Sequence, residues 1–510
     1  MFEATKLGRT VSKEFYKEQE PDLRYQLLET QRRLAGSKIP VVVVVYGVDG
    51  AGKGEVVNLL NEWLDTRGMA TYAFWDETRE DQERPRYWRF WQSMPPRGQI
   101  SILFGAWYME PMQRRMQDLC TDAQLDDELK RIEEFERMLT EDGTLLVKFW
   151  FHLPKQEQKK RLKKLAADVH SRWKMEAKKP ELPDYDKFEK ISERVIRQTD
   201  NGLAPWFLIE ATDRRYRDLT VGRTLLKAIN TRLEQPDVVP HGSFSHAPSL
   251  PSEASALVTV LDHVDLTQTV DKVDYKKRLP KLQEELNLLA WDAYHKKRSC
   301  VLVFEGWDAS GKGGAIRRVT TAIDARLYRS IQIAAPTDEE KAHHYLWRFW
   351  RHIPRAGRLT IYDRSWYGRV LVERVEGFAN ELEWRRAYSE INSFEEQLVE
   401  SGIILAKFWI HISKEEQLQR FKDREAIPYK QHKITDEDWR NREKWDQYKG
   451  AVNEMVIRTS TEFAPWTLVA GNDKPFARLQ VLETVCDALR KGLKGGHCDP
   501  HSLSPREDKR

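Results

Sequence analysis

Val301-Leu-Val-Phe-Glu-Gly-Trp-Asp-Ala-Ser-Gly-Lys-Gly-Gly314 carries the strongest structural signal in this 510-residue chain. An apolar run leads into Gly306-x-x-x-x-Gly311-Lys312, and residues 315–323 then follow helical spacing. Strand, glycine-rich turn, lysine and helix are together the context of a phosphate-binding loop. Glycines let the backbone approach an anion, helix N-terminal N–H groups face it, and Lys312 adds positive charge. A glycine-rich turn that binds nothing is the alternative, and the complete strand–loop–helix context disfavours it.

The residue after this lysine is Gly313, where phosphate-binding loops commonly carry a Ser or Thr that ligates Mg²⁺. A bound Mg²⁺ must therefore depend more on nearby carboxylates. Asp308 in the loop and Asp363 further along the chain are the candidates. We predict a Mg²⁺ site at these two residues, with Mn²⁺ as the other suitable ion.

The same pattern occurs a second time in the first half of the chain. Residues 41–55 read VVVVVYGVDGAGKGE, so Gly47, Asp49, Gly52 and Lys53 correspond to Gly306, Asp308, Gly311 and Lys312. Arg-Phe-Trp at 89–91 and 348–350, and Lys-Phe-Trp at 148–150 and 407–409, lie at the same offset of 259 positions. Such a constant offset indicates a tandem domain duplication, because solenoid repeats are far shorter.

Each copy contains short apolar runs that alternate with helical stretches. The runs of the first copy are 41–46, 71–74, 100–104, 145–151 and 206–210. Those of the second copy are 300–304, 331–334, 359–363, 403–410 and 467–470. Alternating strands and helices predict an α/β fold: a five-stranded parallel sheet with helices on both faces. Ligands of such sheets bind at the carboxyl ends of the strands, where both glycine-rich loops lie.

The predicted domains are residues 1–234 and 257–491. A Pro/Ser-rich linker at 235–256 separates them, and a disordered tail follows at 492–510. The net charge of +4 is small, so any anion site must come from local clustering. Four cysteines without metal-type spacing suit a reducing compartment, and no apolar run approaches the ~20 residues of a membrane span. We therefore expect a cytoplasmic protein that binds neither membrane nor nucleic acid, and a homo-oligomer stays open.

The two copies differ where the third strand ends. The second copy reads Ile361-Tyr-Asp-Arg-Ser-Trp-Tyr-Gly-Arg369, which places Asp363 to hold Mg²⁺ and Arg364 and Arg369 to grip phosphate oxygens. The first copy has Phe104, Gly105 and Glu110 at these three positions. We therefore predict that the first copy keeps a cradle but has lost the chemistry.

A basic helical segment lies between the fourth and fifth strands of each copy and is a candidate lid. It spans 155–179 in the first copy and 416–445 in the second. A charge run is usually a solvated face, but beside a phosphate loop it also suits an anion-binding lid. For Trp439 and Trp445 we favour packing on the core. For Arg420, Arg424 and Lys433 we favour contact with substrate.

The chain resembles the polyphosphate kinase 2 family, in its two-domain polyphosphate:AMP phosphotransferase branch. The matching motifs are the loop at 304–314, Tyr-Asp-Arg-Ser-Trp-Tyr-Gly-Arg at 362–369, Val-Glu-Arg-Val at 372–375, Lys-Phe-Trp at 407–409, and Ala-Pro-Trp at 464–466 followed by Asp473-Lys474. The resemblance implies a thymidylate-kinase-like P-loop fold. It also implies functional roles for Asp308, Lys312, Asp363, Arg364, Glu373, Arg420 and Arg424.

The predicted reaction is Mg²⁺-dependent transfer of the terminal phosphoryl group of inorganic polyphosphate to AMP, giving ADP. Lys312 and Mg²⁺ would stabilise charge on the transferring group, Arg364 and Arg369 would orient phosphates, and Asp308 would help to place the metal or the acceptor. The residues expected to bind substrate are Gly306, Gly311, Gly313, Gly314, Arg369, Glu373, Arg420, Arg424 and Lys433. An ATP-dependent nucleotide kinase and a non-catalytic polyanion-binding P-loop protein are the alternatives.

Overall fold

The computed structural model describes residues 1–74, 77–167, 184–235, 259–428, 431 and 434–494. Two compact units contain them. The first comprises Met1–Glu77, Phe90–Ser243 and Asp338–His344, and the second Thr78–Arg89, Phe244–Thr337 and Tyr345–Arg510. Each unit holds one sheet, as a tandem duplication requires. The predicted tail from residue 495 and almost all of the predicted linker lie outside the described residues, so the domain boundaries stay a prediction.

The sheet of the first unit has five parallel strands in the order β2-β3-β1-β4-β5. The strands are β1 (Val41–Gly47), β2 (Met69–Ala73), β3 (Ile100–Phe104), β4 (Leu145–His152) and β5 (Trp206–Glu210). Every residue of β1 is buried. This agrees with its continuous run of valines, because a central strand of a parallel sheet is covered on both faces.

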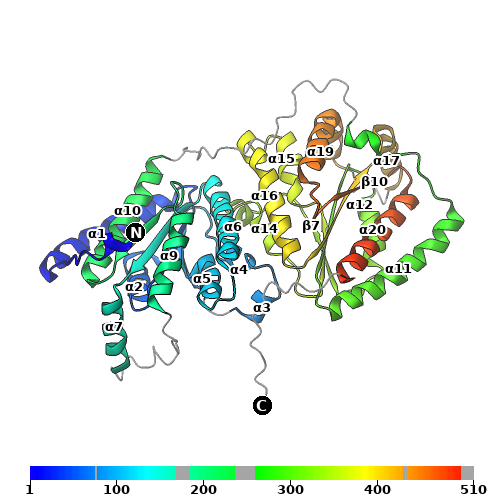
Figure 1. Cartoon of the computed structure of the whole chain (residues 1–510). Helices are drawn as coiled ribbons and strands as arrows, with labels where there is room; N and C mark the ends of the chain where they lie inside the picture. The colour runs from blue at the N-terminus through cyan, green and yellow to red at the C-terminus, as the bar shows by residue number, and fades with distance from the viewer. Residues whose placement is uncertain (75–76, 168–183, 236–258, 429–430, 432–433, 495–510) are drawn as a thin grey trace, which may run out of the picture. The chain divides into compact units, whose positions relative to one another are not determined.

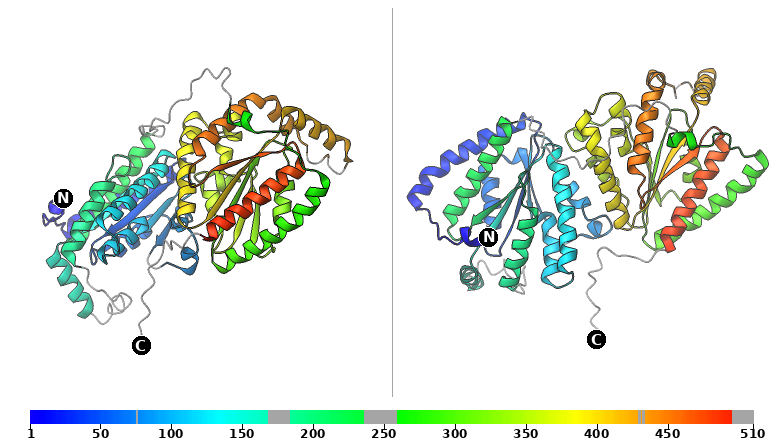
Figure 2. Two further views of the ribbon diagram at one scale, coloured as in Figure 1. Left: turned by 45° about the vertical axis from the view of Figure 1, so that its right-hand side comes forward. Right: turned by 45° about the horizontal axis from the view of Figure 1, so that its top comes forward.

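Helices cover both faces of this sheet (Figures 1 and 2). One face carries α1 (Lys13–Ala35), α2 (Lys53–Trp63) and α10 (Arg214–Glu234), and the other carries α5 (Met109–Met116), α6 (Asp122–Glu141) and α9 (Tyr185–Thr199). The first half of the chain also contains α7 (Lys155–Ala167), α3 (Arg79–Gln82), which belongs to the second unit, and α4 (Trp88–Trp91), which spans the division between the two units. Only the first part of the candidate lid of this copy, α7, is described, since residues 168–183 lie outside the described part of the chain.

The second sheet repeats this topology in the order β10-β9-β6-β8-β7. Its parallel strands are β6 (Cys300–Gly306), β7 (Tyr328–Gln332), β8 (Leu359–Asp363), β9 (Ile404–His411) and β10 (Trp466–Ala470). The sequence predicted β7 three residues too late, at 331–334. This edge strand is polar and half exposed, so no apolar run marks its start.

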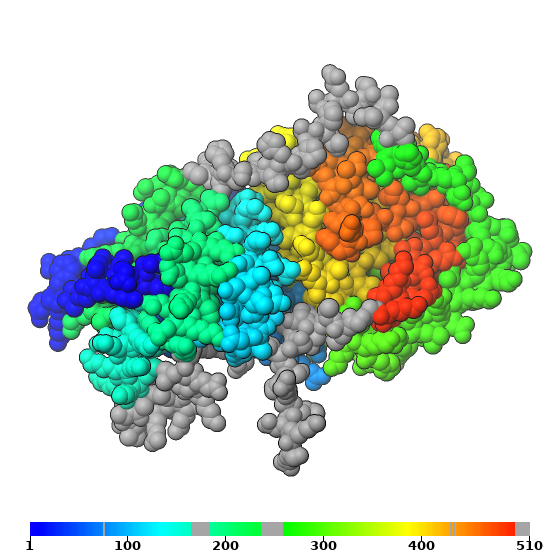
Figure 3. Space-filling model, in the orientation of Figure 1, coloured from blue at the N-terminus to red at the C-terminus, as the bar shows by residue number. Residues whose placement is uncertain are grey.

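Two helical layers also enclose the second sheet. One layer contains α11 (Lys272–His295), α12 (Lys312–Thr320) and α20 (Lys474–Lys494), and the other contains α16 (Glu381–Glu400) and α19 (Trp445–Thr459) (Figure 1). Figure 3 shows α19 and α20 reaching the surface on one face of this unit. The other elements are α13 (Asp338–Lys341), α14 (Trp347–Trp350), α15 (Val372–Val375), α17 (Lys414–Ala426), α18 (Asp436–Glu443), and the 3-10 helices η4 (Val260–His263) and η5 (Trp366–Arg369).

A buried ion pair supports the turn that follows β8. Lys407 in β9 donates to Glu395 in α16 over 2.6 Å, and both side chains are inaccessible to solvent. Glu395 also accepts hydrogen bonds from Trp366 and Tyr367 of η5. The first copy repeats the arrangement with Lys148, Glu136, Trp107 and Tyr108. Because both copies keep it, this network belongs to the scaffold and not to the chemistry.

No helix in the described part of the chain is both long enough and apolar enough to cross a bilayer.

Candidate active site

The phosphate-binding loop of the second copy joins β6 to α12, as the sequence predicts. Gly306 has φ +148°, and a Cβ built there would lie 2.6 Å from the backbone oxygen of Ile410, so only glycine fits. Gly311 caps α12 in the left-handed region at φ +112°. The ammonium of Lys312 turns back and donates to the backbone oxygens of Gly306 and Trp307. The lysine therefore lies within the loop, where it can face a bound phosphate.

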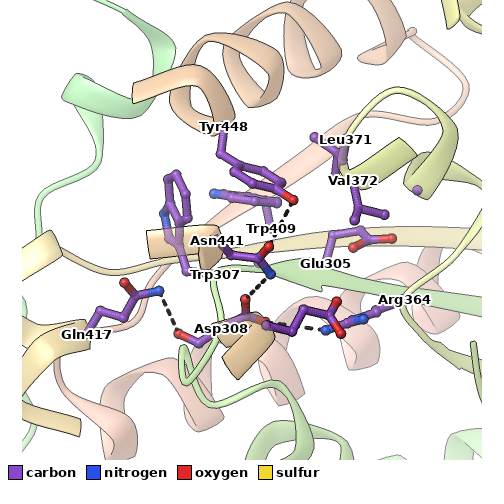
Figure 4. Close-up of a pocket in the computed structure, with 13 residues that line it drawn as sticks. Glu305, Trp307, Asp308, Arg364, Leu371, Val372, Trp409, Gln417, Asn441 and Tyr448 are labelled. Atoms are coloured by element: carbon purple, nitrogen blue, oxygen red, sulfur yellow. Dashed lines mark hydrogen bonds and ion pairs between the residues drawn. The ribbon is translucent and has the colours of Figure 1, made fainter. Parts of the chain in front are cut away.

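Asp308 is held by donors from three directions (Figure 4). Its carboxylate accepts from the amide of Asn441 at 2.9 Å and pairs with Arg364 at 3.4 Å, while its backbone oxygen accepts from the amide of Gln417 at 3.1 Å. Asn441 belongs to α18 and Gln417 to α17, so both helices of the candidate lid contact the loop. The arrangement fixes the loop carboxylate beside a guanidinium.

Asp363 ends β8 level with Phe304 of β6, beside the loop. Within the described part of the chain, its carboxylate has no hydrogen-bond or ion-pair partner. The neighbouring Arg364 has a raised pKa: partial desolvation lowers it, but the carboxylates of Asp308, Glu305, Glu437 and Asp363 outweigh that effect. Carboxylates thus gather around one guanidinium, so this edge of the sheet carries negative charge that a cation can neutralise.

The carboxylates near the phosphate loop suit a magnesium ion that takes most of its ligands from substrate and water. Among the described residues, no group of three or more His, Cys, Asp or Glu side chains could hold a metal ion. Mg²⁺ commonly binds through one or two carboxylates while substrate phosphates and water complete its shell. Asp363, with an unpaired carboxylate, fits such a ligand, whereas the carboxylate of Asp308 is already engaged by protein donors.

One pocket lies on the β8 side of the loop and is partly aromatic (Figure 4). Its volume is about 80 Å³. The lining combines aromatic and aliphatic side chains with carboxylates and amides: Glu305, Gly306, Trp307, Asp308, Arg364, Gly368, Leu371, Val372, Trp409, Gln417, Glu437, Asn441 and Tyr448. We call it the aromatic pocket.

A second pocket, of about 430 Å³, opens on the other side of the same loop. Its residues are Ala309, Ser310, Gly311, Gly314, Ala315, Ile410, Arg420, Asp423, Arg424, Ala426, Ile427, Lys474, Ala477 and Arg478. Four cations face one carboxylate there, and none of these residues is aromatic. Desolvation and then the positive charge of Arg420 lower the pKa of Lys474, although the carboxylates of Glu416 and Asp423 oppose the shift. We call it the basic pocket.

The guanidinium of Arg420, which the sequence predicts to contact substrate, makes its hydrogen bonds within the protein. It is 3% exposed, and all five of its N–H groups are donated within the protein: one to Glu416, two to the loop oxygens of Ala309 and Ser310, and two to those of Gly471 and Asn472. The first copy's Arg161 binds the corresponding backbone oxygens. Arg420 therefore holds the loop in this structure, and its contact with substrate stays a prediction.

The other predicted substrate-binding residues divide into those near a pocket and those outside. Arg424 and Gly314 line the basic pocket, and a Cβ at Gly313 would meet nothing within 4 Å. Arg369 pairs with Glu373 at 3.2 Å and lies over the Tyr345 ring, and neither member of this pair lines either pocket. Lys433 lies outside the described residues.

Both lid tryptophans pack against other rings, but only Trp445 packs outside the lid, so the predicted packing on the core is not met by Trp439. Trp445 is 7% exposed and stacks on Trp307 of the loop with 3.8 Å between ring centroids. Trp439 contacts Phe421 edge-on at 5.1 Å. Trp445 therefore carries α19 onto the phosphate loop, so its packing role also shapes the site.

Sequence reasoning missed several residues of the site. Glu305, Asn441 and Tyr448 line the aromatic pocket, and Lys474 and Arg478 line the basic one. A comparison of the copies signals some of them, because Glu305 and Arg478 correspond to Tyr46 and Asp218. Asn441 and Tyr448 carry no such signal, since only the folded lid brings them to the loop.

The loop of the first copy is filled by its own side chains. Arg217 donates to the oxygen of Ala51 at 3.2 Å and pairs with Glu55 at 3.0 Å, and a Cβ built on Gly52 would lie 1.6 Å from its Nη1. The second copy has Ala477 and Gly314 at the positions of Arg217 and Glu55. Arg217 thus occupies the space that is the basic pocket in the second copy.

A five-stranded parallel sheet with this strand order, a glycine–lysine loop after its central strand and an aspartate after the neighbouring strand define a P-loop phosphotransferase. The chain belongs to the polyphosphate kinase 2 family, whose model matches residues 10–237 and 269–495, and the resemblance drawn from the motifs is confirmed.

The relatives match over nearly their full length. The polyphosphate:AMP phosphotransferase of Pseudomonas aeruginosa is 50% identical over 501 residues, covering 97% of this chain and 99% of the relative. That of Acinetobacter johnsonii is 36% identical over 481 residues, covering 92% and 96%. A crystal structure described as a polyphosphate kinase 2 from Pseudomonas aeruginosa PA01 has a TM-score of 0.86 at 48% identity, covering 97% of this chain and 99% of that one.

Proposed function

We propose that this chain transfers the terminal phosphoryl group of inorganic polyphosphate to AMP, giving ADP, at the loop of its second copy. The observation that carries the proposal is the pair of pockets on opposite sides of one phosphate loop: Gly306, Trp307 and Asp308 line one, and Ala309 to Gly311 line the other. A donor bound in one pocket and an acceptor bound in the other would meet at the loop between them. The names of the full-length relatives support the choice of these two substrates.

Polyphosphate is assigned to the basic pocket. A chain of phosphates offers negative charge along its length and nothing to stack, and the lining matches it with cations and no aromatic ring. The adenine of an ATP donor would find no stacking partner among these residues. This favours polyphosphate over ATP as the donor.

AMP is assigned to the aromatic pocket. The rings of Trp409 and Tyr448 and the aliphatic side chains of Leu371 and Val372 suit a nucleoside. A volume of about 80 Å³ is too small for a nucleotide, since ligand pockets measure roughly 300–1,000 Å³. Entry of AMP therefore requires α18, which is tied to Asp308 through Asn441, to move outward.

The transfer itself balances simply. An oxygen of the AMP phosphate attacks the terminal phosphorus of polyphosphate, the bond to the bridging oxygen breaks, and the shortened polyphosphate leaves with that oxygen. Lys312 and Arg364 are placed to neutralise the charge on the transferring group, which is the main requirement of phosphoryl transfer. Mg²⁺, or Mn²⁺ in its place, would be held by Asp363 and would supply further charge neutralisation.

We further propose that the first copy does not transfer phosphate. Phe104 stands where Asp363 would hold a metal, and Arg217 with Glu55 fills the space above the loop. A cytoplasmic location follows from the AMP substrate and from the few cysteines in the chain.

The donor test is direct. With AMP and Mg²⁺, we expect ADP to form at a high rate from polyphosphate and at a rate at least tenfold lower from ATP. Chromatography of the nucleotides with either donor measures both rates. Robust phosphorylation of AMP by ATP with none from polyphosphate would instead assign a nucleotide kinase, and no transfer from either would assign a polyanion-binding protein.

The basic pocket gives a second prediction. Replacing Lys474 or Arg478 with alanine is expected to raise the KM for polyphosphate by about tenfold, because each removes a cation from the lining of the basic pocket, while kcat and the KM for AMP change little. Arg214, the first-copy counterpart of Lys474, is the matched control, and its alanine variant should leave the KM for polyphosphate unchanged. Because the pKa of Lys474 lies below 10.5, kcat/KM for polyphosphate should fall as pH rises through that lowered pKa. An unchanged donor KM in both pocket variants would remove polyphosphate from this pocket.

A further inference from the structure

Arg364 has an unusual backbone. Its φ is +64°, in the left-handed region that a residue with a Cβ adopts only with backbone strain. The corresponding residue of the first copy is Gly105 at φ +87°, which pays no such penalty. The next residue of the first copy, Ala106, has φ +44°, whereas its counterpart Ser365 is extended at φ −155°. The two turns thus differ in backbone conformation, and the second copy places its strain on the arginine. Strain of this kind persists where the surroundings hold it and the side chain is needed.

The residue after it is tied to the end of β6. The Ser365 hydroxyl donates to Oε1 of Glu305 over 2.8 Å and accepts from the backbone N–H of Tyr367 over 3.3 Å. Glu305 and Ser365 are 5% and 2% exposed, so the hydrogen bond is shielded from water and cannot easily be exchanged for one to solvent. On the other side, the backbone N–H of Arg364 donates to the oxygen of Phe304. Hydrogen bonds to β6 therefore hold the backbone of Arg364 itself and the side chain of the residue that follows it.

The first copy forms a turn of different backbone conformation at this place, and it lacks this hydrogen bond. Tyr46 and Ala106 stand at the positions of Glu305 and Ser365, so neither partner is present. The buried Lys–Glu network beneath the turn is nevertheless the same in both copies. Glu305, Arg364 and Ser365 are replaced together, along with the aspartate that precedes them. The hydrogen bond between Glu305 and Ser365 therefore occurs in the copy that has Arg364 and Asp363, and it is absent from the copy that lacks them.

The pair also bears on the arginine side chain. Figure 4 shows Glu305 and Arg364 lining the same pocket, with Arg364 paired to Asp308 of the loop. The Arg364 side chain is 45% exposed, so its guanidinium keeps donors for a ligand. Burying a carboxylate such as Glu305 is costly, and burial raises its pKa, although Lys312, Ser365 and Arg364 oppose that shift. A scaffold role alone would be met by the uncharged tyrosine of the first copy.

We propose that Glu305 and Ser365 are positioning residues for phosphoryl transfer, whose hydrogen bond holds the strained backbone at Arg364 and keeps its guanidinium on the transferring group. This rests on the proposed function of the same site. A misplacement of about 1 Å at a reacting centre can cost about a hundredfold in rate. The effect should therefore appear in kcat and not in the binding of AMP.

The test is a double-mutant cycle on the full-length protein with polyphosphate, AMP and Mg²⁺. Ser365→Ala is expected to lower kcat by about 10–100-fold with the KM for AMP within about threefold of wild type. Arg364→Gly, which copies the first copy, should lower kcat further. The double variant should match Arg364→Gly within about threefold, because a residue that acts through Arg364 has nothing left to position. Thr360→Val removes another buried hydroxyl of β8, bonded to His352, and should leave kcat unchanged.

The outcomes separate the two proposals. The wild-type rate tests the function, whereas the ratios between variants test the positioning. Wild-type kcat in Ser365→Ala, losses that multiply in the double variant, or a change confined to KM would each overturn the positioning role. If Ser365→Ala does not fold, Glu305→Gln enters the same cycle: it retains an acceptor for the Ser365 hydroxyl but removes the charge facing Arg364. It should lower kcat several-fold in the wild-type background and not at all beside Arg364→Gly.

Discussion

Replacing Lys312 with alanine, or Asp363 with asparagine, is expected to reduce ADP formation from polyphosphate and AMP by about a thousandfold. An ammonium ~4 Å from a phosphate charge interacts by about 4 kcal/mol at an effective dielectric near 20. If most of that interaction is realised in the transition state, its loss slows turnover by about three orders of magnitude. Asp363→Asn keeps the shape of the side chain but removes the unpaired carboxylate at the end of β8. Steady-state ADP formation by the two folded variants measures both effects.

Lys53→Ala is the matched control, because Lys53 occupies the equivalent place in the first loop. That loop already contains Arg217 paired with Glu55, so a phosphate has no open cradle there. Most of kcat should remain, and the KM for polyphosphate should change little. If Lys53→Ala were as inactive as Lys312→Ala with an unchanged melting temperature, the proposed division between the copies would be wrong.

The second large effect is expected on stability. Glu395→Ala should destabilise the second unit by about 3–5 kcal/mol, because it leaves the fully buried ammonium of Lys407 without its counter-ion. It also removes the acceptor of Trp366 and Tyr367, which would otherwise keep unpaired buried donors. The turn that carries Arg364 should loosen as well, so kcat should fall even below the melting temperature.

Thermal unfolding followed by circular dichroism measures this loss, with activity as the second readout. Since the chain has two units, the transition of the second unit is the quantity to compare. Lys296→Ala is a suitable control: it breaks a surface pair with Asp292, whose members are 50% and 42% exposed, and should cost less than about 0.5 kcal/mol. An equally small effect of Glu395→Ala would show that the buried pair contributes little.

Much of the fold and the centre of the site could be predicted from local sequence. The bounds of β3, β5 and β8 match the predicted runs, because each strand is mostly apolar and turn or polar residues flank it. The loop glycines could be identified because their conformations exclude other residues, and Lys312 and Asp363 because their positions follow from the strands they terminate. The start of the edge strand β7 was predicted three residues too late, because this strand is polar and half exposed and has no continuous apolar run.

The sequence by itself determined that the chain is a duplicated P-loop protein of a recognisable family, and that the second copy alone retains the strand-end carboxylate. It could count the charges of the lid but could not show where each guanidinium points. Only the tertiary structure showed that Arg420 donates to the backbone of the phosphate loop and that Arg217 occupies the phosphate loop of the first copy. It alone also showed that Ser365 donates to Glu305. Each of these contacts joins residues that are between about 50 and 170 positions apart in the chain and that come together only after the sheet has formed. A pattern in the local sequence cannot predict such a contact.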